Sequence, residues 1–493
     1  MILYNDPAVD GYVRGEVYPD GPWRGPKCIE RGTLYRWSLY AGDPLTPGWA
    51  ATRHAPRIPV EESNMALIPP TTTVGYGGAQ QIFEHLTGPA APADWQGGFP
   101  FEYRLGGPGS PTVHLEIDIE YAPRPSETVV VRIPGSEYPD EVVAVGSHWD
   151  TWAYGTSDNT AGATLLLEVA RGLGVLVDSG WRPKRTVLLA FFGAEDRGIT
   201  GSTEFAEQLG AGVDKVVTFI NPAHLGGSTF RASTVPALEE FLFDAARRVE
   251  WGGSGRTIYE SWSQGAGTPS VPRRASGDAL AFLYHFGAPV LNIGASSQGG
   301  RYHSACDDFR SQRMFDDPEL LHQASMARLG GLLALRLAGA DLLPFRYSAY
   351  AEEVAGYLRE LEEVQRAELG RVAVALDRHV EQAAAWAEAA RGFEAAAAGL
   401  LERGGDASDF RRLNRALMKV ERSLLVGRGL PGRFWYTHQI YAPELHDGFA
   451  VATLPGVRDA LFLEEDLDSA ERYASDLLTS LREATAIFGE TVP

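Results

Sequence analysis

The alternation of apolar and polar residues divides the chain into three regions of different texture. Residues 1–125 hold short alternating stretches, such as VHLEIDIEY at 113–121, between segments rich in glycine and proline. Alternation over a few residues is typical of half-buried strands, and clusters of glycine and proline are typical of turns. We therefore expect a β-rich region with many turns and one clear helix, GGAQQIFEHL, at 77–86.

Residues 126–340 alternate continuous apolar runs with amphipathic helical patterns. The runs EVVAVGSH, RTVLLAFF, KVVTFIN and APVLNIGAS predict buried strands, and NTAGATLLLEVARGLGVL is the clearest helix between them. Such alternation is typical of an α/β three-layer sandwich with a mixed, largely parallel sheet. Polar residues directly after these strands would lie at the carboxyl ends of the sheet, where open α/β folds place their sites.

Residues 341–493 are almost entirely helical in pattern and rich in alanine. Apolar residues recur at helical spacing with Glu and Arg between them, as in AEEVAGYLRELEEVQRAELG at 351–370. We expect a bundle of amphipathic helices here. The sequence therefore predicts three domains, with boundaries near residues 125 and 340.

Composition narrows the class of protein without changing the expected fold. The chain has 493 residues and a formal charge of −20, which argues against a nucleic-acid partner because such proteins carry basic patches. No window approaches 18 unbroken apolar residues, and no basic segment followed by an apolar run opens the chain. We therefore expect no membrane-spanning helix, no signal peptide and a cytoplasmic location. The two cysteines, Cys28 and Cys306, exclude a disulfide framework, and we expect them to stay unpaired.

Three polar clusters follow the predicted strands of the middle region. They are His148, Asp150 and Asp158 in GSHWDTWAYGTSDNTAG, Glu195 and Asp196 in FFGAEDRGITGSTEF, and Tyr302 and His303 in GGRYHSACDD. Imidazole and carboxylate are groups that bind zinc, and a neighbouring carboxylate can act as general base. Taken singly, each residue also fits a structural histidine or a helix cap. Together, in this order on an α/β domain, they predict a zinc-dependent hydrolytic site.

These motifs resemble a known family. GSHWDTWAYGTSDNTAG, AEDRGITGSTEF and RYHS are similar to the zinc peptidases that include glutamate carboxypeptidase II and related aminopeptidases. MILYNDPAVDGY, YPDGPW and AGDPLTPGW resemble the apical, protease-associated domain of that enzyme and of the transferrin receptor, and IYAPELHDGFAVATLPGVRDALF resembles their helical dimerisation domain. The resemblance covers nearly the whole chain. The family's most N-terminal segment has no counterpart among these motifs. The resemblance implies a homodimer formed through the C-terminal helices.

The resemblance also implies roles for the clustered residues. In the family two zinc ions share one Asp, which corresponds to Asp158. His148 would bind the first zinc, with Asp150 orienting it. Asp196, where the family usually has Glu, and His303 would bind the second zinc. The implied general base is Glu195, and Tyr302 is placed to stabilise an oxyanion.

One ligand of the family is missing from this chain. The first zinc also takes a late Asp in the family, and the matching position is Ala223 in FINPAHLGG. His224 is adjacent, although consecutive residues near a strand end point in different directions. We therefore expect one zinc, held by Asp158, Asp196 and His303, with a second zinc only where His224 takes over as a ligand.

The resemblance implies a calcium site in this chain but not the family's specificity for glutamate. The residues that recognise glutamate in the carboxypeptidase correspond to Gly448 and Phe449, and no Arg occurs at Asn292–Gly294. We therefore expect a neutral or apolar peptide-like substrate. The family's structural calcium site corresponds to a larger set, which is Thr46, the carbonyl of Trp49, Glu204 and Glu207.

Three functions fit these observations. A zinc-dependent hydrolase of a peptide or amide bond is favoured because Glu195 is retained. A zinc-dependent cyclase or acyl transferase on the same site is the second, since the glutaminyl cyclases resemble this superfamily with one zinc. The third is a non-catalytic binding protein like the transferrin receptor, which Ala223 favours.

Overall fold

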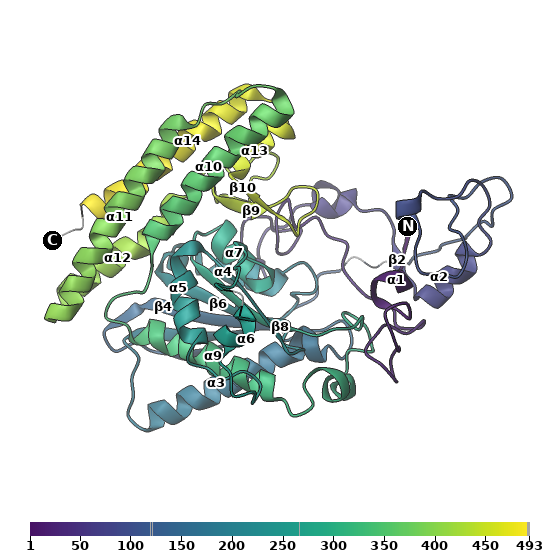
Figure 1. Ribbon diagram of the computed structural model, residues 1–493, viewed down its shortest axis with the longest axis horizontal. Helices are drawn as coiled ribbons and strands as arrows, with labels where there is room; N and C mark the ends of the chain where they lie inside the picture. The colour runs from purple at the N-terminus through teal and green to yellow at the C-terminus, as the bar shows by residue number, and fades with distance from the viewer. Residues whose placement is uncertain (119, 121, 266, 491–493) are drawn as a thin grey trace.

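A computed structural model describes residues 1–490 apart from 119, 121 and 266 (Figure 1). Figure 1 shows three parts side by side. A mainly irregular N-terminal region lies at one end, a sheet covered by helices lies in the middle, and long helices from the C-terminal part of the chain lie at the other end.

A six-stranded sheet forms the centre of the molecule, with strand order β3-β5-β4-β6-β8-β7. The four inner strands are mutually parallel, and β3 and β7 pair antiparallel at the two edges. The predicted mixed, largely parallel sheet is therefore confirmed. The strands are β3 (Val129–Ile133), β4 (Tyr138–His148), β5 (Arg185–Phe192), β6 (Val216–Pro222), β7 (Thr229–Thr234) and β8 (Val290–Ser296).

Helices cover both faces of this sheet. Helices α3 (Ala161–Asp178) and α9 (Leu321–Gly339) pack on one face, and α4 (Thr200–Leu209) and α7 (Leu280–Tyr284) lie on the face toward the C-terminal helices (Figure 1). The shorter helix α6 (Ile258–Ser263) packs against β7, and α5 (Glu239–Ala246) packs against α6 and α9. Every residue of β5 is buried, as expected for a strand covered on both faces.

One helix among the described residues is long and apolar enough to cross a membrane by those two criteria alone. It is Thr156–Asp178, which comprises α3 and the turn before it. Its residues Leu165, Leu166 and Val169 belong to the buried core, and α3 packs on the sheet beside α9. A core helix of this kind passes the same test, so this helix is weak evidence for a membrane span.

The C-terminal region is helical, as predicted. It comprises α10 (Tyr347–Leu369), α11 (Asp377–Arg403), α12 (Ala407–Ser423), α13 (Pro455–Phe462) and α14 (Leu467–Gly489), with a small hairpin of β9 (Tyr441–Pro443) and β10 (Val451–Thr453). Its buried residues belong to the same hydrophobic core as those of the sheet. Polar contacts also cross this boundary, since Arg422 on α12 donates to the carbonyl oxygens of Val213 and Val216, at 3.1 and 2.7 Å.

The N-terminal region contains less regular structure than the sequence predicts. The expected helix is present as α2 (Tyr76–Phe83), preceded by the short α1 (Pro7–Asp10). In the described part of residues 1–125, the strands are β1 (Ile2–Leu3) and β2 (Thr72–Thr73), so the region is not β-rich. Residues 113–118 form no strand, and most are exposed. A strand needs a hydrogen-bonding partner as well as an alternating pattern, and these residues have none among those described.

The two cysteines form a disulfide bond, so the expectation that they stay unpaired is wrong. Cys28 and Cys306 are 278 residues apart in sequence, with 6.2 Å between their Cα atoms. The bond joins the N-terminal region to a loop beyond β8. Sequence spacing carries no information about a contact over this distance.

Candidate metal centre

The predicted site residues meet at the carboxyl ends of the inner strands. His148 is the last residue of β4, and Asp196 lies four residues beyond the end of β5. Asp158 comes from the turn Thr156–Thr160 that opens α3, and its peptide bond to Asn159 is cis. His224 follows β6 and His303 follows β8. Parallel strands end at one edge of a sheet, which is why residues so distant in sequence converge there.

Asp158 lies at the centre of this cluster, and its two carboxylate oxygens face different partners. Oδ1 lies 3.5 Å from Nε2 of His148 and 3.1 Å from Nδ1 of His224. Oδ2 lies 2.8 Å from Nε2 of His303, and that nitrogen is 3.4 Å from Oδ1 of Asp196. The cluster therefore has two groups of donor atoms that share one bridging carboxylate.

His224 faces the cluster because of its backbone conformation. Its φ of +53° lies in the left-handed region, which is uncommon for a residue with a side chain. The backbone is held there by two contacts, since its N–H donates to Oδ1 of Asn159 and its carbonyl accepts from Ala295. This turn directs the imidazole toward Asp158, while Ala223 has no side-chain atom that could bind a metal. The His224 side chain remains 57% exposed.

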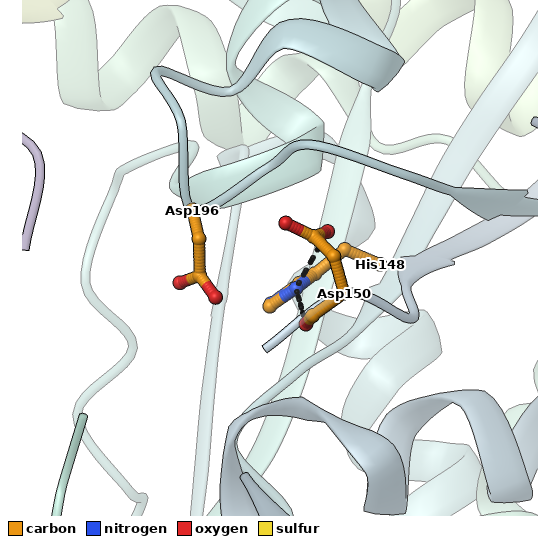
Figure 2. A group of neighbouring side chains, drawn as sticks. All are labelled: His148, Asp150 and Asp196. Atoms are coloured by element: carbon orange, nitrogen blue, oxygen red, sulfur yellow. Dashed lines mark hydrogen bonds and ion pairs between the residues drawn. The ribbon is translucent and has the colours of Figure 1, made fainter. Parts of the chain in front are cut away.

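Other contacts orient the imidazoles of His148, which is buried, and His303, which is 17% exposed. Nδ1 of His148 lies 3.2 Å from the backbone carbonyl oxygen of Asp150 and 3.6 Å from its carboxylate, and Figure 2 shows both contacts with Asp196 on the other side of the ring. Nδ1 of His303 lies 3.0 Å from the carbonyl oxygen of Arg31. Donation from Nδ1 in each case leaves Nε2 free to face Asp158, an arrangement typical of metal-binding histidines.

Charge and burial shift the pKa values of this cluster in opposite directions. Burial would raise the pKa of Asp158, but the imidazoles of His224, His148 and His303 lower it well below its usual range. Burial opposes the charged form of His148, but Glu195 and three aspartates, Asp150, Asp158 and Asp278, raise its pKa well above the usual value. For Asp196, burial and then the charge of Asp158 raise the pKa to about 7. The imidazoles therefore stabilise the charged form of Asp158, but they do not offset the burial of Asp196 and its repulsion by Asp158.

The cluster has the properties expected of a site that binds a cation. Oδ1 of Asp158 and Oδ2 of Asp196 are buried and have no hydrogen-bond partner among the described residues. Donor atoms within 4.8 Å of one another are offered by His148, Asp150 and Asp196, and also by Asp158, Asp196 and His303. Buried polar atoms need partners, and buried carboxylates need countercharge. A divalent cation would supply both, so the residues present fit a metal.

Glu195 and Tyr302 lie beside this donor set. Oε2 of Glu195 is 3.9 Å from Nε2 of His148, and its backbone N–H donates to the carboxylate of Asp150 at 3.0 Å. Burial raises the pKa of Glu195. The Tyr302 ring stacks on His303 with 3.7 Å between centroids and lies 5.7 Å from the His224 ring.

Two further acids in the site were missed from the sequence. Asp278 is buried, burial and then the charge of Glu195 raise its pKa to about 7, and its own charge raises the pKa of His148. Asp307 accepts from the backbone N–H and hydroxyl of Ser157 and from the N–H of Asp158, which fixes the bridging residue. Each stands at the start of a short helical turn or beside one, where Asp is ordinarily a cap. The sequence pattern alone gives no reason to assign these two aspartates to the candidate site instead of to helix capping.

The residues matched to a calcium site also lie together. Glu204 accepts backbone N–H groups of Asp43 and Ala51, and Glu207 accepts the indole N–H of Trp435 at 3.0 Å. Burial raises the pKa of Glu204 to about 8 and that of Glu207 to about 7. Oγ1 of Thr46 and Oε2 of Glu207 are buried without a hydrogen-bond partner among the described residues. The indole of Trp49 donates to Pro56, and its backbone N–H donates to Thr46.

Comparison with known proteins relates most of the chain to peptidases. Residues 128–317 match Peptidase family M28, and residues 374–489 match the Transferrin receptor-like dimerisation domain. The chain is 32% identical to "Probable glutamate carboxypeptidase LAMP1" of Arabidopsis thaliana, over 94% of this chain and 66% of that protein. It is 30% identical to "Aminopeptidase NAALADL1" of Mus musculus, over 99% of this chain and 70% of that protein.

Among solved structures, a zinc aminopeptidase from Bacillus subtilis is similar at 18% identity with a TM-score of 0.32, over 42% of this chain and 49% of that one. The chain spans about two thirds of the length of the curated relatives it matches.

Proposed function

The chain belongs to peptidase family M28 and carries a transferrin receptor-like dimerisation domain, and on this premise we propose that it is a zinc-dependent hydrolase of peptide or amide bonds. The observation that carries this proposal is the two-sided donor set around Asp158. Named relatives include a glutamate carboxypeptidase and an aminopeptidase, so the family alone does not select the end of the substrate that is cleaved.

We assign two metal positions to this donor set. His148, His224 and Asp158 would hold one ion, and Asp158, Asp196 and His303 would hold the other. The contact at 3.1 Å between His224 and Asp158 supports two ions over the single ion expected from the sequence. Bound zinc supplies a Lewis acid and water of lowered pKa.

The remaining residues would carry the proton transfers. Glu195 would take a proton from the attacking water and return it to the leaving amine, a task that suits a carboxyl group whose pKa burial has raised. Asp150 would hold His148 and the backbone of Glu195 in place. The Tyr302 hydroxyl would donate to the developing oxyanion, and burial raises its pKa further, so it stays protonated.

The decisive experiment combines metal content with product analysis. We expect about two zincs per chain, hydrolysis of some members of a panel of blocked and free peptides, and loss of hydrolysis with a chelator that zinc reverses. Release of ammonia or amine without consumption of water would favour the cyclase instead. Zero zinc after incubation with the metal, together with no turnover, would leave the non-catalytic binding protein.

We also propose that Thr46, Trp49, Glu204 and Glu207 hold a calcium ion. Two glutamates on one face of α4 whose pKa values are both raised by burial indicate missing countercharge, and calcium accepts hard oxygen ligands. Calorimetric titration with calcium tests this, with Glu207→Gln as the variant that should lose the binding.

Assembly and location are proposals as well. The dimerisation domain supports a homodimer through the C-terminal helices, which light scattering would show, and the domain boundaries near 125 and 340 stay predictions. The cytoplasmic location also stays a prediction. The disulfide is a feature typical of proteins in oxidising compartments, so counting thiols in protein from the native source would test that location.

A further inference from the structure

The segment Cys28–Arg31 lies against the loop that carries His303. The N–H of Arg31 donates to the carbonyl of His303 at 2.9 Å, and Nδ1 of His303 lies 3.0 Å from the carbonyl oxygen of Arg31. One backbone unit of the N-terminal region therefore makes both hydrogen bonds to this histidine. The second bond makes Nδ1 the donor and leaves Nε2 facing Asp158.

The disulfide joins the same two segments. Cys28 precedes Arg31 by three positions, and Cys306 follows His303 by three. Both cysteines are only 8% exposed, so the bond is packed into this contact. The two hydrogen bonds and the covalent bond therefore lie within one short stretch on either side, and the covalent bond limits how far Arg31 can move from His303.

His303 needs such support because its backbone is in an unfavourable conformation. Its φ of +56° lies in the left-handed region, which a residue with a side chain keeps only when its surroundings fix it. Neighbouring contacts reach the same loop from the N-terminal region, since Arg24 donates to the carbonyl of Tyr302 at 3.3 Å and Arg301 donates to that of Pro22 at 2.9 Å. These are single hydrogen bonds, whereas the disulfide is the covalent constraint.

We propose that Cys28 and Cys306 are positioning residues for the metal site, and that their disulfide holds His303 in its ligating orientation. Reduction by a dithiol opens it through thiol–disulfide exchange. The Cys28–Cys306 bond breaks, the dithiol closes to its own disulfide, and its two protons pass to the two cysteine thiols. Metal affinity then falls on the side of Asp196 and His303 and is kept on the side of His148 and His224. This inference rests on the proposed metal site.

The first test counts thiols in the purified full chain, unfolded in denaturant without reductant. We expect no free thiol before reduction and two afterwards. Two free thiols in protein purified without reductant from an oxidising host would overturn the proposal.

The second test measures binding of Co²⁺ and Zn²⁺ by competition with a chromophoric chelator, and records the visible absorption of the Co²⁺ form. Oxidised wild type is compared with reduced wild type freed of dithiol and with the Cys28→Ser/Cys306→Ser variant. We expect one of the two binding steps to weaken roughly 10–100-fold, the usual effect of losing a group that orients a ligand. The cobalt spectrum should change with it, while the other step stays constant.

The controls separate positioning from general loss of structure. The double serine variant should not respond to dithiol, and reduced wild type covers the case in which that variant fails to fold. Equal affinities in the oxidised and reduced forms would overturn the positioning role and leave the proposed function intact. Equal weakening of both steps would also overturn it, because that is the result of a merely structural bond. Absence of metal binding in every form would overturn both proposals.

Discussion

The two sides of Asp158 are built differently. On the Oδ2 side, His303 is 17% exposed and is held by both hydrogen bonds of Arg31 and by the disulfide nearby. On the Oδ1 side, His148 ends a buried strand, but its partner His224 is 57% exposed and stands on a short backbone turn. One side is fixed by distant parts of the chain, and the other depends on one local conformation.

This difference concerns the position at which the resemblance implies an Asp ligand. Ala223 stands there, and the next residue, His224, lies 3.1 Å from Oδ1 of Asp158 with a φ of +53°. An exposed imidazole on a short turn can be gained or lost with little effect on the core. The Oδ2 side offers no such freedom, because its ligands contact other regions.

The largest effect should come from removing the residue that both sides share. Asp158→Asn is expected to lose both zincs and to lower hydrolysis by roughly 10³-fold or more, since a metal contributes several kcal/mol to transition-state stabilisation. Elemental analysis and peptide turnover measure this. Asp150→Asn is the matched control, with a smaller loss of roughly 10–100-fold. Two zincs retained in Asp158→Asn would contradict the bridging role.

Glu195→Gln should separate metal binding from proton transfer. We expect kcat to fall by roughly 10²–10⁴-fold, the usual contribution of a general base, while zinc content stays unchanged. Steady-state kinetics and metal analysis on the same sample give the answer. Near-normal kcat would assign the proton transfer to another group, of which the buried Asp278 is the nearest candidate.

His224→Ala tests the adaptable side directly. Zinc content should fall from about two to about one per chain, with the remaining ion on the side of His303. The double variant Ala223→Asp/His224→Ala restores the family's acid at its own position and should recover the second zinc. One zinc in both wild type and His224→Ala would show that His224 is not a ligand and would return the site to the single ion expected from the sequence.

The smallest effect concerns calcium and pH. The folded-state pKa values of Glu204 and Glu207, about 8 and about 7, exceed the ordinary 4.5, so protonation favours the folded state. That contribution is complete below about pH 4.5 and disappears as the pH rises through 7 and 8. Calcium needs both carboxylates charged, so we expect it to bind at least tenfold more tightly at pH 8.5 than at pH 6.

Calcium at a free concentration a hundredfold above its Kd should stabilise the folded protein by about 2.7 kcal/mol. Thermal unfolding at the two pH values, with magnesium as control, measures it. A calcium-induced rise in Tm that is equal at both pH values would contradict the role of these carboxylates.

Sequence reasoning found the parts of the site that follow strands. His148 ends an apolar run, and Glu195 and Asp196 follow another, so their position at the edge of the sheet could be predicted from local pattern. The orientation of His224 could not, because it depends on a left-handed φ of +53° that local sequence pattern does not predict. Asp278 and Asp307 were missed because Asp at the start of a helical turn is ordinarily a cap.

Contacts between distant segments were beyond sequence reasoning altogether. The carbonyl of Arg31 and the Cys28–Cys306 bond act on His303 from more than 270 residues away in the chain, as the separation of 278 shows for the cysteines. No periodicity records such a pairing. The alternation at 113–118 predicts a strand that does not form, for a related reason. A strand also depends on a hydrogen-bonding partner elsewhere in the chain.

The hydrogen bond from Arg422 to the carbonyl oxygen of Val216 connects the C-terminal helices to a strand that leads to the donor cluster. Val216 is the first residue of β6, and the same strand ends at Pro222, immediately before Ala223 and His224. Strand β6 therefore runs from the contact with α12 at one end to the turn that carries His224 at the other. A hydrogen bond from the region that matches the transferrin receptor-like dimerisation domain thus reaches the strand that ends beside the more exposed histidine of the cluster.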